Sequence, residues 1–228
     1  MKYLIIPIII VVGLLGACKK NSDSAVPDTH SSFMFVNAVP NSEFNVMLDT
    51  INFASNVGYG TVTPYKSYRA QKYNVIITLS GQPVALFNVQ LFLRNKRYYT
   101  AFLGADSAVQ QLSLIITEDD MSSLGTGTAK FRVIDFSQGF KPNRTPLGMD
   151  VYSGAAPLFF RGLTAPSQTA FAPLYGDSAY TINFRYVDSS LVLKSFTLPT
   201  QTGKVYTLVT TGYPLDSTRF NILKVTHN

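Results

Sequence analysis

The second half of the chain repeats the pattern of the first half at an offset of 107 residues. Residues 73–76 align with residues 180–183, and residues 97–100 align with residues 204–207. Tyr68 aligns with Tyr175. After one inserted residue in the second copy, Leu112 aligns with Phe220. A repeat of this length is as long as a small domain, so the sequence predicts two tandem copies of one fold.

Both copies carry the pattern of β-strands. From residue 33 onward, short runs rich in Val, Ile, Phe, Tyr and Thr alternate with clusters of Gly, Pro, Asn, Asp and Ser. The chain holds 13 Tyr and 16 Phe among its 228 residues, and only 14% of the residues are charged. Aromatic and β-branched side chains suit a pleated, half-buried surface. The composition therefore predicts an all-β protein with about seven strands in each copy.

The chain begins with an apolar run that ends in Leu15-Gly16-Ala17-Cys18. The run is shorter than the roughly 20 residues that a transmembrane helix needs, and Lys2 precedes it. The pattern resembles the signal of bacterial lipoproteins, which is cut before the cysteine. The resemblance implies a chain that starts at Cys18 and is held at the outer membrane of a Gram-negative envelope by acyl chains, facing the periplasm or the cell surface. The alternative is an ordinary signal peptide followed by an unmodified cysteine.

The domain organisation follows from these segments. We expect a signal peptide at residues 1–17, a flexible polar tether at 18–31, a first β-sandwich at 32–121, a Gly/Ser/Thr-rich linker at 122–128, and a second β-sandwich at 129–228. Each copy is expected to fold by itself.

Several stretches of the first copy resemble a named family, the domain of unknown function 4397 of bacterial extracytoplasmic proteins. They are residues 35–40, 44–46, 59–65, 73–75 and 98–100. The second copy keeps three comparable stretches, at 149–152, 180–182 and 206–209. It lacks the glycine-tyrosine loop of 59–65 and has an insertion at 141–146. The resemblance implies two tandem immunoglobulin-like antiparallel β-sandwich domains and no established activity.

The sequence lacks the residues that most kinds of active site need. His30 lies in the predicted tether and His227 one residue from the end of the chain, so neither is expected in a built pocket. This argues against a catalytic triad, a zinc site, a cofactor and an enzyme in general. The formal charge of +6 comes from scattered lysines and arginines, which does not predict nucleic-acid binding.

Carboxylates leave two weaker alternatives. Glu43 and Glu118 are the only glutamates, and a carboxylate-dependent hydrolase would have to use them or aspartates. The run Glu118-Asp119-Asp120 is interpreted as an acidic segment between the domains rather than as a calcium site, because no ligand-loop pattern surrounds it.

Five Ser or Thr residues lie in triplets of Asp, then Ser or Thr, then an apolar residue, with Thr218 accepted in the third place of the last triplet. The triplets resemble the O-glycosylation sequon of certain Gram-negative bacteria. An equally good interpretation is turn chemistry, because Asp followed by Ser or Thr favours a turn before a strand. The candidate acceptors are Ser24, Thr50, Ser107, Ser178 and Ser217.

Tyrosines provide the candidate ligand-binding face, for a sugar or a peptide. The alternative is packing within strands and tyrosine corners, and adjacent strand tyrosines are expected to point to opposite faces. The candidates are Tyr59, Tyr65, Tyr68, Tyr98 and Tyr99.

The sequence thus predicts a non-enzymatic, lipid-anchored envelope protein that serves as a binding, adhesion or structural module. Its expected partners are the membrane, through Cys18, and a glycan or an envelope protein. The alternative function is an accessory subunit of an envelope complex that presents a sheet edge or a loop to a larger partner.

Overall fold

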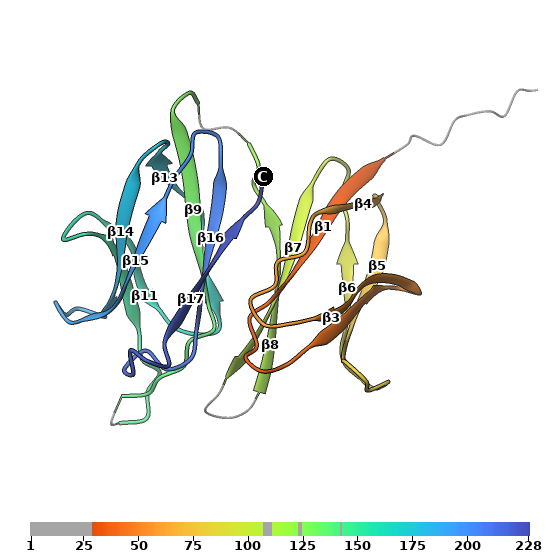
Figure 1. The fold of residues 1–228 in the computed structure, drawn as a ribbon, viewed down its shortest axis with the longest axis horizontal. Helices are drawn as coiled ribbons and strands as arrows, with labels where there is room; N and C mark the ends of the chain where they lie inside the picture. Colours follow the sequence, from red (N-terminus) through yellow and green to blue (C-terminus); the bar gives the residue numbers. More distant parts are fainter. Residues whose placement is uncertain (1–28, 107–110, 123–124, 142) are drawn as a thin grey trace, which may run out of the picture.

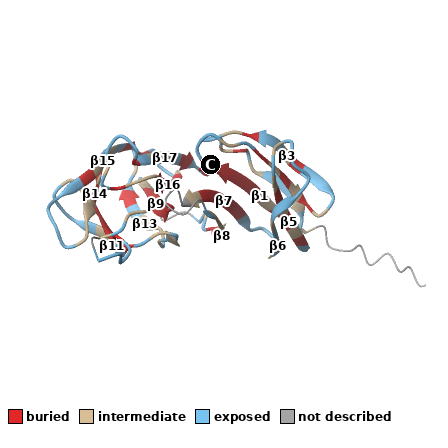
Figure 2. Ribbon diagram, turned by 90° about the horizontal axis from the view of Figure 1, so that it is seen from below, coloured by how far each residue is buried: buried red, intermediate tan, exposed pale blue. Residues whose placement is uncertain are grey.

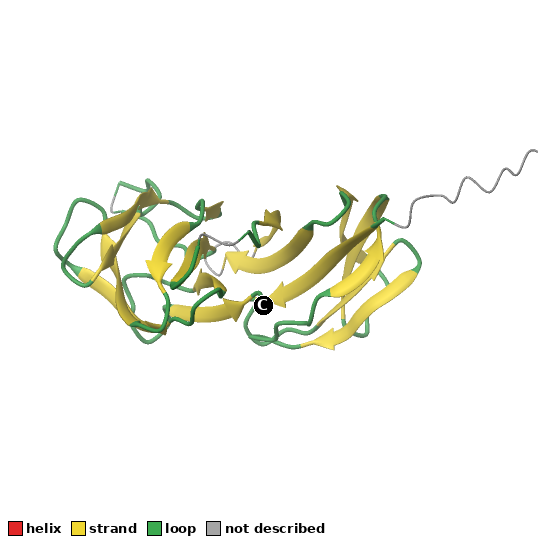
Figure 3. Cartoon of the chain, turned by 90° about the horizontal axis from the view of Figure 1, so that it is seen from above, coloured by secondary structure: helices red, strands yellow, loops and turns green. Residues whose placement is uncertain are grey.

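The computed structural model describes residues 29–106, 111–122, 125–141 and 143–228. The predicted signal peptide, Cys18, Ser24 and Ser107 lie outside these residues. The described residues form strands and loops but no helix, which confirms the all-β prediction (Figure 3). Within the described part of the chain, no helix could cross a membrane.

Strands β1 to β8 form the first β-sandwich (Figure 1). One sheet has the order β4-β1-β7-β8 and the other has the order β3-β2-β5-β6. The strands are β1 (His30–Asn37), β2 (Phe44–Leu48), β3 (Ile51–Val57), β4 (Lys66–Arg69), β5 (Lys72–Leu79), β6 (Ala85–Phe92), β7 (Tyr98–Asp106) and β8 (Gln111–Asp119).

The second β-sandwich repeats this arrangement. Its sheets have the orders β12-β9-β16-β17 and β11-β10-β14-β15, and β13 also pairs with β9. The strands are β9 (Thr128–Asp135), β10 (Met149–Ser153), β11 (Leu158–Leu163), β12 (Ser167–Gln168), β13 (Ala172–Tyr175), β14 (Ala179–Tyr186), β15 (Val192–Pro199), β16 (Val205–Thr211) and β17 (Asn221–Thr226).

The predicted antiparallel β-sandwiches are confirmed, with one parallel strand pair in each. β1 pairs with β7 in parallel, and β9 pairs with β16 in parallel. The chain leaves β1, builds the opposite sheet and then returns to β7. This long crossover lets neighbouring strands run in the same direction.

Each sandwich has its own apolar core, built by alternation along the strands. In β5, Val75 and Ile77 point inward and are fully buried, and the aligned Ile182 and Phe184 of β14 do the same. Residues two apart on a strand lie on one face, so this register places the repeated pattern in equivalent cores.

A third apolar cluster lies between the two sandwiches. The outer face of β1 and β7 packs against the outer face of β9 and β16, so the central strands are buried on both sides (Figure 2). The fully or nearly fully buried members are Met34, Val36, Ala38, Phe102, Ile134, Phe136, Val209 and Val225. The two sandwiches therefore contact each other through sheet faces rather than through the linker alone.

Two boundaries differ from the sequence-based expectation. β1 begins at His30, inside the predicted tether, because residues 30–33 pair with β4. Glu118 and Asp119 are not part of an acidic linker, because they end β8 and pair with β7.

Candidate functional site

A buried ion pair joins the two sandwiches. Arg132 of β9 donates a hydrogen bond from Nη2 to Oδ1 of Asp119, the last residue of β8. Their side chains are only 3% and 0% exposed. Burial raises the pKa of Asp119 and lowers that of Arg132, while the attraction between the two charges opposes both shifts. The guanidinium also lies 4.6 Å from the ring centroid of Phe171.

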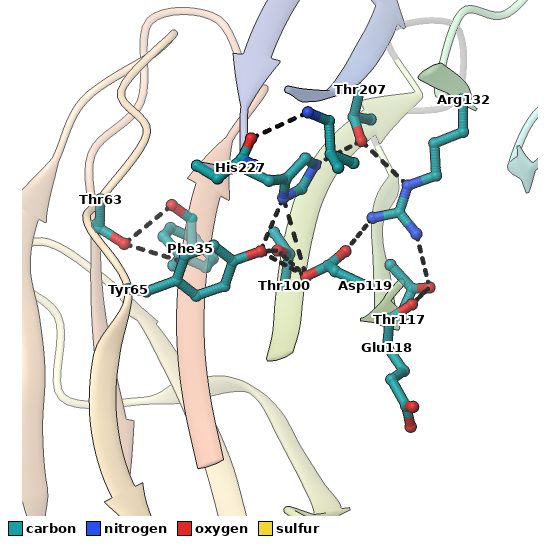
Figure 4. A network of polar contacts seen from close by, with 12 residues as sticks. Phe35, Thr63, Tyr65, Thr100, Thr117, Glu118, Asp119, Arg132, Thr207 and His227 are labelled. Carbon is teal, nitrogen blue, oxygen red and sulfur yellow. Dashed lines mark hydrogen bonds and ion pairs between the residues drawn. The ribbon is translucent and has the colours of Figure 1, made fainter. Parts of the chain in front are cut away.

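The ion pair belongs to a closed ring of hydrogen bonds (Figure 4). Arg132 Nε donates to Thr207 Oγ1 at 3.0 Å, and Thr207 Oγ1 donates to His227 Nε2 at 2.7 Å. His227 Nδ1 donates to Tyr65 Oη at 2.8 Å, and Tyr65 Oη donates to Asp119 Oδ2 at 2.8 Å. This direction of donation gives every proton in the ring an acceptor, with a neutral histidine that carries its proton on Nδ1.

The expectation that His227 lies outside any built environment is wrong. β17 pairs with β16, and the pairing carries His227 into the space between the sandwiches, where its side chain is fully buried. The C-terminus accordingly lies between the two sandwiches (Figure 1). Burial, and secondarily the nearby Arg132 charge, lower the pKa of His227 to about 3. The imidazole is therefore neutral at physiological pH.

Equivalent positions of the two copies meet in this ring. Thr100 pairs with Thr117 and Thr207 pairs with Val225, so the strand pairing makes Asp119 the counterpart of His227. Thr100 Oγ1 donates to Asp119 Oδ2 at 2.6 Å, as Thr207 donates to His227. Both copies thus use the same outer face. The repeat already contained this signal, because the one-residue insertion aligns Asp119 with His227.

The glycine-tyrosine loop at residues 59–65 reaches the second sandwich from the first. Thr63 Oγ1 accepts a hydrogen bond from the Phe35 amide at 2.9 Å, which fixes the loop against β1. Tyr59 Oη lies 3.5 Å from Thr211 Oγ1, and Tyr65 contacts His227. Burial, with the Asp119 charge next, raises the pKa of Tyr65 above its ordinary value, so its hydroxyl keeps its proton.

The titratable groups of the ring are buried, and their pairing links the two sandwiches. Among the described residues, no group of three or more His, Cys, Asp or Glu side chains is placed to hold a metal ion. Glu118 forms ion pairs with Arg94 and Arg97, while Glu43 lies exposed just before β2.

The five candidate tyrosines do not form one face. Tyr99 is buried at 5% exposure while Tyr98 is 37% exposed, as strand alternation predicts. Tyr99 Oη accepts a hydrogen bond from the Arg94 amide, five residues back, which is the packing role that the sequence left as the alternative. Tyr68 lies against Phe53 in the first core.

The Asp-Ser/Thr sites within the described residues occupy exposed turns. Thr50, Ser178 and Ser217 are all exposed. Asp216 Oδ1 accepts a hydrogen bond from the Thr218 amide at 3.0 Å, within its own turn. Asp49 and Asp177 instead accept from residues that are distant in sequence, Asn74 and Thr202. Local turn hydrogen bonding therefore accounts for the Asp216 triplet, and exposure leaves the hydroxyls of Thr50, Ser178 and Ser217 accessible to solvent.

Asp135, at the end of β9, is a buried carboxyl that sequence reasoning missed. Oδ1 accepts hydrogen bonds from Ser137 and Thr210, but Oδ2 has no partner among the described residues. Burial raises the pKa of Asp135 to about 6. The equivalent position in the first sandwich is Asn37, whose Nδ2 donates to two backbone carbonyls.

The Asp135→Asn substitution is expected to change the free energy of unfolding more favourably at pH 7.5 than at pH 3.5. The difference between the two pH values should be on the order of 2–3 kcal/mol. A carboxyl with a raised folded-state pKa contributes stability below its unfolded pKa, near 3.8, and loses it as the pH rises to about 6. Urea denaturation at both pH values measures the difference. The control Asp188→Asn, at an exposed carboxylate, should show little change, and an equal response of both variants would contradict the assignment.

Comparison with known proteins identifies the first sandwich. Residues 31–142 match the family model "Domain of unknown function (DUF4397)". This segment is a DUF4397 domain. None of the curated proteins compared with the chain is similar to it. One similar solved structure is the crystal structure of CBMbc (family CBM26) from Eubacterium rectale Amy13K in complex with maltoheptaose. It is 8% identical, with 86% of this chain and 97% of that chain covered, at a TM-score of 0.30.

The second sandwich keeps more of the DUF4397 loop than its sequence suggested. Thr169 Oγ1 accepts a hydrogen bond from the Val133 amide at 2.9 Å, just as Thr63 of the DUF4397 domain accepts from Phe35. Two residues later, Phe171 stands where the DUF4397 domain has Tyr65. The second copy therefore lacks the glycine-tyrosine pair, as its sequence predicts, while the threonine and the aromatic residue of the loop remain.

Proposed function

We propose that this protein is a non-enzymatic, lipid-anchored module of the bacterial envelope whose two sandwiches act as one rigid unit. Cys18 anchors the unit at the outer membrane, and the tether that follows separates it from the lipid surface. The unit presents its loops and sheet edges to an envelope protein or a glycan. The alternative function is that of an accessory subunit in a larger envelope complex.

The observation that carries the proposal is the interface between the sandwiches. It combines an apolar cluster with a buried ion pair and a closed hydrogen-bond ring. Polar groups buried with complete pairing favour one arrangement of the elements that carry them. A rigid pair of sandwiches on a tether suits display of a surface, whereas substrate turnover would need accessible titratable groups.

Cys18→Ala is expected to release the protein from the membrane fraction, because stable anchoring needs acyl chains on that cysteine. The measurement is fractionation of cells of the native host, with a high-salt wash of the membrane pellet. Ser24→Ala, a change of similar size in the same predicted tether, is the matched control and should stay in the pellet. Retention of the Cys18→Ala variant after the wash would contradict the anchor.

Crosslinking on intact cells tests for binding partners. Crosslinking followed by mass spectrometry on whole cells should return envelope proteins joined to exposed lysines of the sandwiches. Intact mass of the native protein decides the glycan question at Ser24, Thr50, Ser107, Ser178 and Ser217. A mass equal to polypeptide plus lipid would leave the triplets as turn formers only.

A further inference from the structure

The second sandwich has an apolar pocket of about 390 Å³ at the end of its core, beside β13 and β14. Its wall includes Ser153, Pro157, Phe159, Leu174, Tyr175 and Tyr180. None of the residues that line it is charged. A volume of several hundred Å³ with mostly apolar walls is typical of small-ligand sites.

Strand pairing shows what occupies this place in the first sandwich. Tyr68 of β4 pairs with Ser31, and Leu174 of β13 pairs with Ala129, the counterpart of Ser31. Tyr68 therefore corresponds to Leu174 and not, as the sequence alignment has it, to Tyr175. A shift of one residue reverses the face of a strand, and Tyr175 accordingly points outward at 76% exposure.

A second replacement makes the second core still less filled than the first at this place. Leu48 pairs with Val75, and Ser153 pairs with Ile182, the counterpart of Val75, so Ser153 stands in the place of the fully buried Leu48. Two smaller side chains, Ser153 and Leu174, thus open the second core where the first is filled.

The first sandwich also supplies the shape of the missing group. The ring of Tyr68 lies 6.2 Å from the ring of Phe53 and 6.1 Å from the ring of Tyr73. By strand pairing, Phe53 and Tyr73 correspond to Phe159 and Tyr180, two walls of the pocket. At the equivalent place in the first sandwich, the chain's own phenol ring therefore packs against two aromatic side chains.

We propose that the pocket of the second sandwich binds a neutral, phenol-sized aromatic ring supplied from outside the chain. Phe159 and Tyr180 contact the ring, and Leu174 forms the floor. Tyr180 Oη accepts a hydrogen bond from the Tyr175 amide at 2.9 Å, which leaves its proton for a polar substituent of the ligand. A sugar suits the pocket less, because buried hydroxyl groups need more hydrogen-bond partners than these walls supply.

The ring has two possible sources, a small aromatic molecule or a tyrosine side chain of a partner polypeptide. The test uses the chain from residue 18 with Cys18→Ala, so that its result does not depend on the proposed lipid anchor. The proposed aromatic-ring site rests on the proposed binding function only because it assumes a ligand from outside the chain. The probes are p-cresol for the free molecule, a capped Gly-Tyr-Gly peptide for the side chain, and maltose for a sugar.

Saturable binding of p-cresol or the peptide, with a dissociation constant in about the millimolar range, is expected by NMR titration. Tighter binding of the peptide identifies the polypeptide source, and tighter binding of p-cresol identifies the small molecule. Intermolecular NOEs from the probe ring to Phe159 and Tyr180 locate the site. Binding of maltose alone, or no binding of any probe, overturns the proposal.

Leu174→Tyr introduces the residue that packs against the first core at the equivalent place, and it should weaken binding at least about tenfold without lowering the thermal unfolding temperature. Ser153→Leu, the second filling change, should weaken binding as well. Leu191→Tyr adds the same side chain at an exposed position of the same sandwich and should leave binding unchanged. Unaltered binding in both filling variants, with the fold intact, overturns the assignment of the site.

Discussion

Arg132→Met is expected to lower the free energy of unfolding by about 3–5 kcal/mol, because it leaves the Asp119 carboxylate buried without its counter-charge. Methionine fits the position sterically, since Met34 occupies the equivalent place on β1. Guanidinium chloride denaturation measures the change. Arg161→Met, which removes a guanidinium that is 69% exposed, is the matched control and should change stability by less than about 0.5 kcal/mol.

A double variant separates the charge from the packing. Arg132→Met combined with Asp119→Asn should recover most of the lost stability, because no uncompensated charge then remains between the sandwiches. The amide oxygen can still accept hydrogen bonds from Tyr65 and Thr100. A single Arg132→Met variant as stable as the wild type would mean that the sandwiches do not bury this pair in solution.

Phe136→Ala is expected to cost about 3–5 kcal/mol, because the ring is buried between the sandwiches and its removal leaves a cavity there. The ring lies directly on Gly104 of β7. A Cβ added at Gly104 would come within 2.1–2.4 Å of three ring atoms of Phe136, so Gly104→Ala alone should also destabilise the interface.

The two changes should not add. In the double variant the missing ring makes room for the new methyl group, so Gly104→Ala should cost far less there than in the wild type. Denaturation gives the coupling, and small-angle X-ray scattering should show a larger radius of gyration for Gly104→Ala when the sandwiches separate. Gly58→Ala, with no heavy atom nearer than 4.0 Å, is the control. Strict additivity would contradict the contact between Phe136 and Gly104.

Much of the fold was predictable because the signals are local. Alternation along residues 73–77 places Val75 and Ile77 in a core, and the repeat transfers that prediction to β14. The runs 33–36 and 131–134 also differ from the half-buried strands, because they do not alternate cleanly between apolar and polar residues. Such runs are typical of strands buried on both faces. Sequence reasoning missed this signal for the covered outer faces of β1 and β9.

The candidate site was less predictable because its contacts are long-range. Arg132 and Asp119 lie 13 residues apart on different sandwiches, and His227 joins them only after β17 has paired with β16. Its position near the end of the chain suggested an unstructured histidine. The pairing of Tyr68 was equally hidden, because a one-residue shift between β4 and β13 leaves the sequence alignment plausible while it reverses the face.

The sequence by itself determined the all-β class, the two equivalent copies and the inward residues of their cores, because strand periodicity and turn residues act over a few neighbours. Only the tertiary structure decided that the copies pack through one shared outer face. It alone placed a neutral histidine beside an ion pair and left open in the second core the place that Tyr68 fills in the first. These features depend on which faces meet and on register between distant strands, and side-chain pattern along the chain does not encode either uniquely.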